Sequence, residues 1–75
     1  MQQMDAVEVY TARYEREHGH KPQGKRFWRF ILVSESVTAK DHTFALDQIM
    51  TYPMALEKAQ EVAGLRKSIR IIVEP

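Results

Sequence analysis

The sequence predicts one small α+β domain over residues 1–75, with a single helix packed on one face of a small antiparallel sheet in the order β-β-β-α-β. Three observations predict it. Arg26–Val33 is dense in aromatic and β-branched residues, Pro53–Ala63 repeats its apolar residues at helical spacing, and Ser68–Val73 is a second β-branched run. The length allows one domain only.

The N-terminal segment, residues 6–17, admits two interpretations. Its β-branched residues alternate with other residues, which favours a strand that pairs with Lys25–Ser34 in a hairpin. The capping-box spacing of Asp5 and Glu8, with Gly19 as a stop signal, favours a helix instead. The strand is our prediction, and the helix stays open as the alternative.

The glycine- and proline-containing stretch His18–Gly24 predicts a loop that leads into the clearest strand, Arg26–Val33. Both alternating sets of side chains in this strand are mainly apolar. We therefore expect the strand to be central and at least partly covered on both faces. Beyond it, a polar turn at Ala39–His42 and the alternation of Phe44, Leu46 and Met50 with other residues suggest a third antiparallel strand, with a short helix after Asp41 as the alternative.

The helix predicted at Pro53–Ala63 has Thr51 as its N-cap and is ended by Gly64. A strand at Ser68–Val73 then closes the sheet, with Ile69, Ile71 and Val73 on one of its faces. One helix can cover only one face of a sheet. The other face must be covered by the N-terminal segment, if that segment is helical, or by another molecule.

Composition indicates a soluble cytoplasmic protein. The longest apolar run is Phe30–Val33, far short of the roughly 18 residues of a membrane helix, and Met1–Asp5 lacks the features of a signal peptide. The chain has no cysteine, which excludes disulfides and thiolate metal sites. A domain of this size is marginally stable, so association with a partner is the expected supplement to its core.

No motif indicates catalysis, a cofactor or a metal. His18, His20 and His42 are candidate metal ligands, but no spacing selects the carboxylates that would complete a site, and the first two read more simply as part of an exposed loop. Glu57 and Glu61 lie one helical turn apart on the outward side of the predicted helix. We therefore expect a protein that is not an enzyme and holds no cofactor.

The best binding candidate is a basic and aromatic hairpin. The net charge is only +1, yet the stretch from Arg13 to Arg29 holds six basic and two acidic residues. Basic side chains beside aromatic rings can contact phosphates and stack on bases, although Trp28 is equally explained as a core residue. The candidate partner-binding residues are Arg13, Arg16, His20, Lys21, Lys25, Arg26, Trp28 and Arg29.

Two functions follow as hypotheses. The first is a small interaction module that forms a homodimer or docks onto a larger protein, as the two-sided apolarity of the central strand suggests. The second is a nucleic-acid-binding accessory protein that uses the basic hairpin, although the known signatures of RNA-recognition, KH and zinc-finger modules are absent. Neither a membrane nor a small-molecule substrate is expected as a partner.

Overall fold

A computed structural model of the chain describes residues 7–34 and 40–75. In chain order its elements are β1 (Glu8–Tyr10), α1 (Ala12–His18), β2 (Lys25–Arg26), β3 (Arg29–Ser34), β4 (His42–Ala45), β5 (Met50–Thr51), α2 (Tyr52–Arg66) and β6 (Ser68–Val73). The α+β class is confirmed. Within the described ranges, no helix combines the length and the hydrophobicity needed to cross a membrane.

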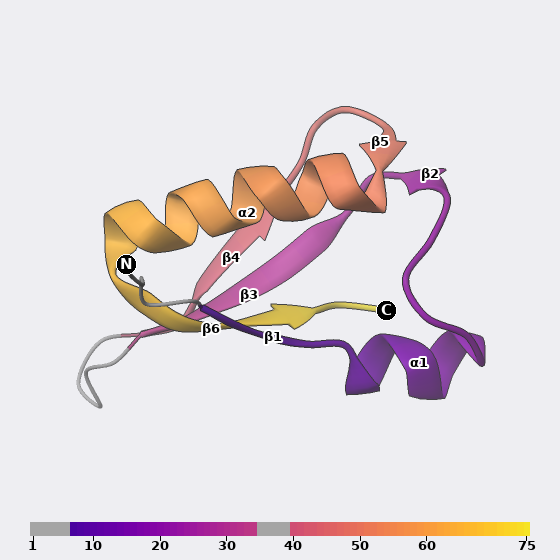
Figure 1. The fold of residues 1–75 in the computed structure, drawn as a ribbon, viewed down its shortest axis with the longest axis horizontal. Coiled ribbons are helices and arrows are strands. Elements are labelled where there is room, and N and C mark those ends of the chain that lie inside the picture. Colours follow the sequence, from indigo (N-terminus) through magenta and orange to yellow (C-terminus); the bar gives the residue numbers. More distant parts are fainter. Residues whose placement is uncertain (1–6, 35–39) are drawn as a thin grey trace, which may run out of the picture.

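The main sheet has four strands in the order β1-β6-β3-β4, and α2 lies across one of its sides (Figure 1). β3 is antiparallel to both of its neighbours, whereas β1 is parallel to β6. The sheet is therefore mixed, and the predicted all-antiparallel sheet is wrong. The six-residue, β-branched strand β6 follows α2 and pairs with β3 along one of its edges. The three-residue β1 pairs with the other edge of β6.

The N-terminal segment contains both of the structures that were weighed for it. Its first part is β1, and its second part is α1, which ends at Gly19 with a left-handed φ of 76°. Gly19 donates its N–H to the carbonyl of Glu15, so the proposed stop signal is confirmed. The hairpin with Lys25–Ser34 is wrong. The capping-box start is also wrong, because Glu8 belongs to β1, while Asp5 lies outside the described residues.

The prediction that the strand ending at Val33 is central is confirmed, because β3 lies between β6 and β4. The predicted strand is nevertheless broken into β2 and β3 at Phe27, and its antiparallel partner is split into β4 and β5. Arg26 pairs with Met50, while the carbonyl of Trp28 accepts the N–H of Leu46. Residues 47–49 therefore stand opposite the single residue Phe27, so two extra residues on that side interrupt the pairing. Residue 39 of the predicted polar turn lies outside the described residues.

The helix α2 is longer than predicted, because Gly64 lies inside it and does not end it. The helix ends instead at Lys67, whose left-handed φ of 57° turns the chain into β6 one residue before the buried Ser68. Thr51 precedes the helix in extended conformation, although its side chain makes no capping hydrogen bond. The buried positions of α2 are Ala55, Ala59 and Ala63, small residues that let the helix pack closely on the sheet.

The core lies between α2 and the sheet. The side chains of β3 and β6 that point toward α2 are at most 1% exposed: Phe30, Leu32, Ile71 and Val73. The predicted bounds of β6 are confirmed, but Ile69 is 41% exposed and does not share the burial of Ile71 and Val73. A register shift at Val33/Ser34 explains this, because it leaves Ile69 without a partner in the ladder.

Candidate functional site

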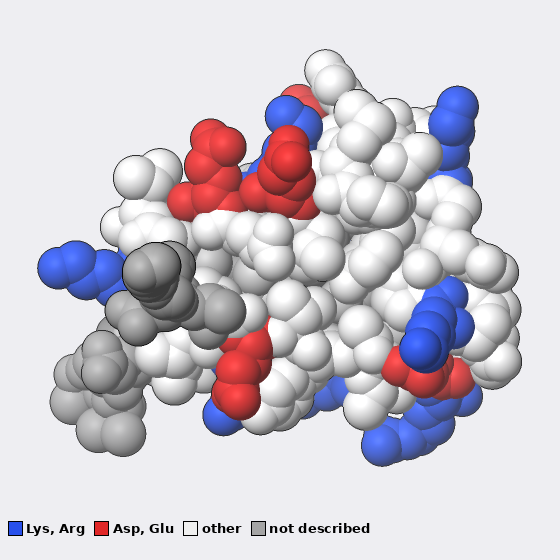
Figure 2. Space-filling view, in the orientation of Figure 1, with Lys and Arg blue, Asp and Glu red and all other residues white. Residues whose placement is uncertain are grey.

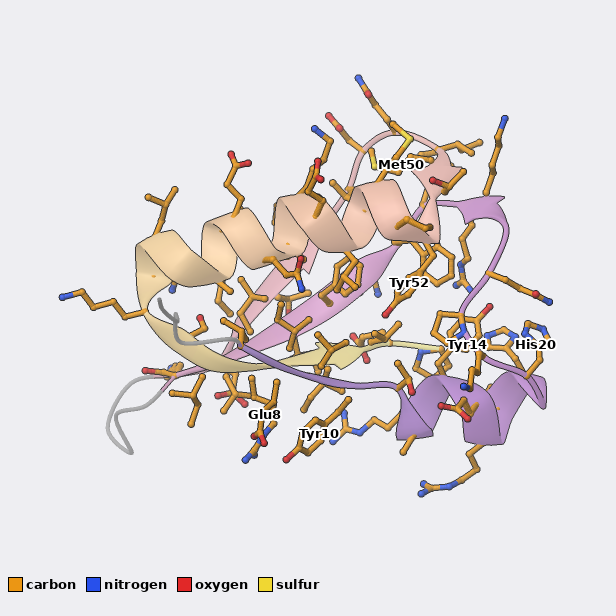
Figure 3. The ribbon with its side chains drawn as sticks, viewed as in Figure 1. Glu8, Tyr10, Tyr14, His20, Met50 and Tyr52 are labelled. Carbon is orange, nitrogen blue, oxygen red and sulfur yellow. The ribbon has the colours of Figure 1, made fainter. Side chains whose placement is uncertain are left out.

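The side of the main sheet that faces away from α2, called here the helix-free face, is the candidate site. Paired residues on neighbouring strands point to the same side of a sheet, so the register arranges this face in three rows. The first row is Glu8, Arg70 and Val33; the second is Tyr10, Ile72, Ile31 and Thr43; the third is Glu74, Arg29 and Ala45. Figure 3 shows Glu8 and Tyr10 pointing away from α2.

The middle row is the apolar part of this face. Tyr10 is 42% exposed, Thr43 is exposed, and Ile31 and Ile72 are half-buried. On the opposite side of the same strands, Phe30 is fully buried beneath α2. The alternating strand pattern therefore places apolar side chains on both faces, while α2 covers only one of them.

The N-terminal helix lies on this side of the sheet, but at one end of it. α1 begins beyond the end of β1, on the side of the sheet away from α2 (Figure 1). Tyr14 is its buried residue, and the Tyr14 ring packs against Trp28 at the end of the core. The N-terminal segment therefore covers this side of the sheet only at the end beyond Tyr10, and the middle row with the exposed Tyr10 and Thr43 stays open.

The first row carries a paired set of charges. A nitrogen of Arg70 lies 3.8 Å from a carboxylate oxygen of Glu8, and the hydroxyl of Tyr10 donates to the same oxygen at 3.3 Å. The guanidinium of Arg70 also lies 4.7 Å from the centre of the Tyr10 ring, within cation–π range. The Nε of Arg70 is buried and has no hydrogen-bond partner in the described part of the chain.

The third row also carries one basic and one acidic residue, Arg29 and Glu74, but these two side chains do not form an ion pair. Arg29 and Glu74 are neighbours on β3 and the end of β6, because the Glu74 N–H donates to the Arg29 carbonyl at 3.0 Å. Their side chains form no ion pair within residues 7–34 and 40–75. With the pair in the first row, the three rows hold two acidic and two basic residues among the described positions.

An open hollow of about 340 Å³ lies at the third row. It is lined by Arg26, Phe27, Arg29, Glu74 and Pro75. The Phe27 ring is 57% exposed, so the hollow has an apolar wall beside its charged groups. A long side chain of a partner that entered here would meet Arg29 and Glu74 together.

Trp28 belongs to the core beside this hollow. It is 1% exposed, and its indole N–H donates to the Met50 carbonyl at 2.9 Å. Its ring lies 5.5 Å from the ring of Tyr14 and 5.1 Å from that of Tyr52, centre to centre. Figure 3 shows Tyr52 directed from the start of α2 toward Tyr14. The Trp28 ring is therefore not presented to a partner.

Arg26 joins these aromatic rings to the end of the chain described here. Its guanidinium lies 5.0 Å from the centre of the Trp28 ring and 5.6 Å from that of Tyr14. One of its nitrogens donates to the carbonyl of Pro75 at 2.9 Å, and another lies 3.4 Å from Nε2 of His18. These contacts give Arg26 a structural role in holding α1, Trp28 and Pro75 together.

The structure does not bring the sequence-predicted binding residues together on one surface. Arg13 and Arg16 are exposed on α1, His20 and Lys21 are exposed in the following loop, and Lys25 is exposed on β2. Arg26 and Trp28 form the contacts just described. Arg29 alone belongs to the helix-free face.

Sequence reasoning missed Tyr10, Ile72, Glu74 and Arg70 as members of one surface. The polar–apolar alternation within Glu8–Tyr10 and Ser68–Val73 is a usable signal, but it becomes informative only once β1 and β6 are known to be neighbours. The histidines near α1 and the Tyr52 hydroxyl are two further polar groups. His18 and His20 have ring centres 5.9 Å apart, and no cluster of three or more potential metal ligands occurs in the part of the chain that the structure describes. Burial raises the pKa of the Tyr52 hydroxyl.

The charge distribution shows no dominant patch in the view of Figure 2. Acidic side chains lie over α2 and also at the α1 end, where they are interspersed with basic side chains that stand mainly at the outline. No protein-family model, curated protein or solved structure matches this chain.

Proposed function

We propose that this chain is a small non-catalytic protein-binding module of the cytoplasm and that its contact surface is the helix-free face. The observation that carries the proposal is the middle row of that face. It places Tyr10, Ile31 and Ile72 side by side on neighbouring strands, where Tyr10 is exposed and the two isoleucines are half-buried. Contiguous exposed apolar surface on a small domain commonly marks a protein interface.

The size of the domain supports the same proposal. A chain of 75 residues buries only about 60% of the surface that its unfolded form exposes, and this one has no cysteine with which to form a disulfide. A protein partner on the helix-free face would bury Ile31 and Ile72 completely and extend the core to both sides of the sheet.

Site-specific photo-crosslinking in cells tests this function without assuming which protein binds. A photoreactive residue replaces Thr43 on the helix-free face in one variant and Gln60 on the outward side of α2 in a matched control, because both positions are exposed. We expect discrete protein adducts from position 43 and none from position 60. Equal crosslinking from both positions, or none from position 43, would overturn the proposal.

Nucleic-acid binding is the second candidate, favoured by exposed basic residues at one end of the molecule. Arg13 and Arg16 on α1 and Lys21 and Lys25 near it are all exposed, and Figure 2 shows basic side chains toward α1. Because Trp28 is buried, the exposed Phe27 is the ring within Lys25–Arg29 that is available for base stacking.

Fluorescence anisotropy with single-stranded and duplex probes tests the second candidate. We expect binding that weakens as salt rises and that R13A and R16A reduce, while K58A on α2 serves as the control. Absence of binding to both probes at low salt would reject this candidate.

A further inference from the structure

We propose that the partner on the helix-free face is a second copy of this chain, packed face to face about a twofold axis that runs between β6 and β3, parallel to the strands. The inference rests on the proposed function and specifies its partner. Two-sheet packing with nearly aligned strands is the common arrangement when two sheets share a core. In an isologous contact each residue meets the partner residue that lies opposite it across the axis.

The rows of the helix-free face fit this axis. Rotation about a line between β6 and β3 exchanges the positions of these two strands and those of β1 and β4. The middle row then places Ile72 against Ile31 of the second copy and Tyr10 against Thr43 of the second copy. The apolar row therefore meets itself, and no charged residue is placed against an isoleucine of that row.

The third row supplies the charge complementarity. The same rotation places Glu74 against Arg29 of the second copy and Arg29 against Glu74 of the second copy. These two residues are the charges of the face that lack an ion pair within the described residues, whereas Glu8 and Arg70 already pair with each other. Both line the hollow beside the exposed Phe27, so the incoming side chain of the second copy has space to enter.

The area of the helix-free face sets the expected affinity of the two copies for each other. β1, β6, β3 and β4 have three, six, six and four residues, and at about 3.3 Å along a strand and about 4.8 Å between strands they give roughly 300 Å² per copy. Stable complexes commonly bury about 800 Å² per partner. We therefore expect a weak dimer, with a dissociation constant in the micromolar range or above, whose formation depends on concentration.

A charge-exchange experiment tests this arrangement. In R29E, two glutamates would face each other across each contact, and in E74R two arginines would do so. We expect each variant alone to self-associate at least about tenfold more weakly than the unaltered chain. In an equimolar mixture of the two variants, the introduced Glu at position 29 of one chain meets the introduced Arg at position 74 of the other, and the native Glu74 of the first meets the native Arg29 of the second. The mixture should therefore associate to within about threefold of the unaltered chain.

Sedimentation equilibrium from about 10 μM to 1 mM covers the range that so small an interface requires. Thermal unfolding of each variant shows whether the single changes leave the fold intact, and Q60E on α2 controls for a change of charge elsewhere. Weak single variants and a recovered mixture support the arrangement. Self-association that neither R29E nor E74R weakens would overturn the contact between Arg29 and Glu74 of the two copies but leave the protein-binding function standing. An unaltered chain that stays monomeric at 1 mM would overturn the second copy as partner, while the crosslinking from position 43 tests the function separately.

Discussion

The change Trp28→Phe should destabilise the domain strongly, because Trp28 joins three parts of the structure. The smaller ring removes the indole N–H that donates to the Met50 carbonyl, and Met50 is only 7% exposed. An unsatisfied buried carbonyl costs about 1–3 kcal/mol, and the cavity left by the smaller ring costs about 1 kcal/mol more. The expected loss is therefore about 2–4 kcal/mol of unfolding free energy, out of the roughly 5–15 kcal/mol of a typical domain.

Urea unfolding followed by far-UV circular dichroism measures this loss. Fluorescence is unsuitable because Trp28 is the single tryptophan of the chain. For a domain of this size the melting temperature should fall on the order of 10–20 °C. The exposed Phe27 provides a matched control, and Phe27→Leu should change stability by less than about 0.5 kcal/mol. A loss below about 0.5 kcal/mol for Trp28→Phe would refute the reasoning that Trp28 is a structural residue.

Three further predictions concern α2 and its ends. Gly64→Ala should raise stability by about 0.5–1 kcal/mol in urea unfolding, because Gly64 lies within α2 and an added Cβ meets no atom within 4 Å; an unchanged midpoint would contradict this. Lys67→Gly should raise it by about 1 kcal/mol in the same assay, because Lys67 has a left-handed φ of 57°, and a loss of stability would show that its side chain matters more than its backbone. Burial raises the pKa of the Tyr52 hydroxyl, so above about pH 10 the unfolded state loses this proton first and the unfolding free energy falls as pH rises. Tyr52→Phe should remove this contribution to the slope of unfolding free energy against pH between about pH 9 and 11. An unaltered slope would exclude Tyr52 as its source.

The local pattern of the sequence predicted those elements that depend on nearby residues. β6 was predicted with its exact bounds, and β3 was predicted as a central strand, because their β-branched and aromatic residues lie consecutively in the chain. Gly19 was named as a helix stop in the helical alternative for residues 6–17, since a left-handed cap favours glycine. The end of α2 was missed because Lys67 adopts that conformation without being glycine.

The pairing of distant strands could not be predicted from local pattern. The parallel contact of β1 with β6 joins the two ends of the described chain, and no turn residue signals it. The helix-free face was predicted only as an uncovered side of the central strand. Its members on β1 and β6, including Tyr10 and Ile72, follow from a register that local sequence does not specify.

The central claim, that a second copy covers the helix-free face, is tested most directly by amide NMR spectra recorded over a concentration series. We expect the signals of Tyr10, Ile31, Thr43 and Ile72 to shift together as concentration rises, while those of Gln60 and Glu61 on the outward side of α2 stay fixed. Spectra that do not change with concentration, or shifts concentrated on α2, would contradict the claim.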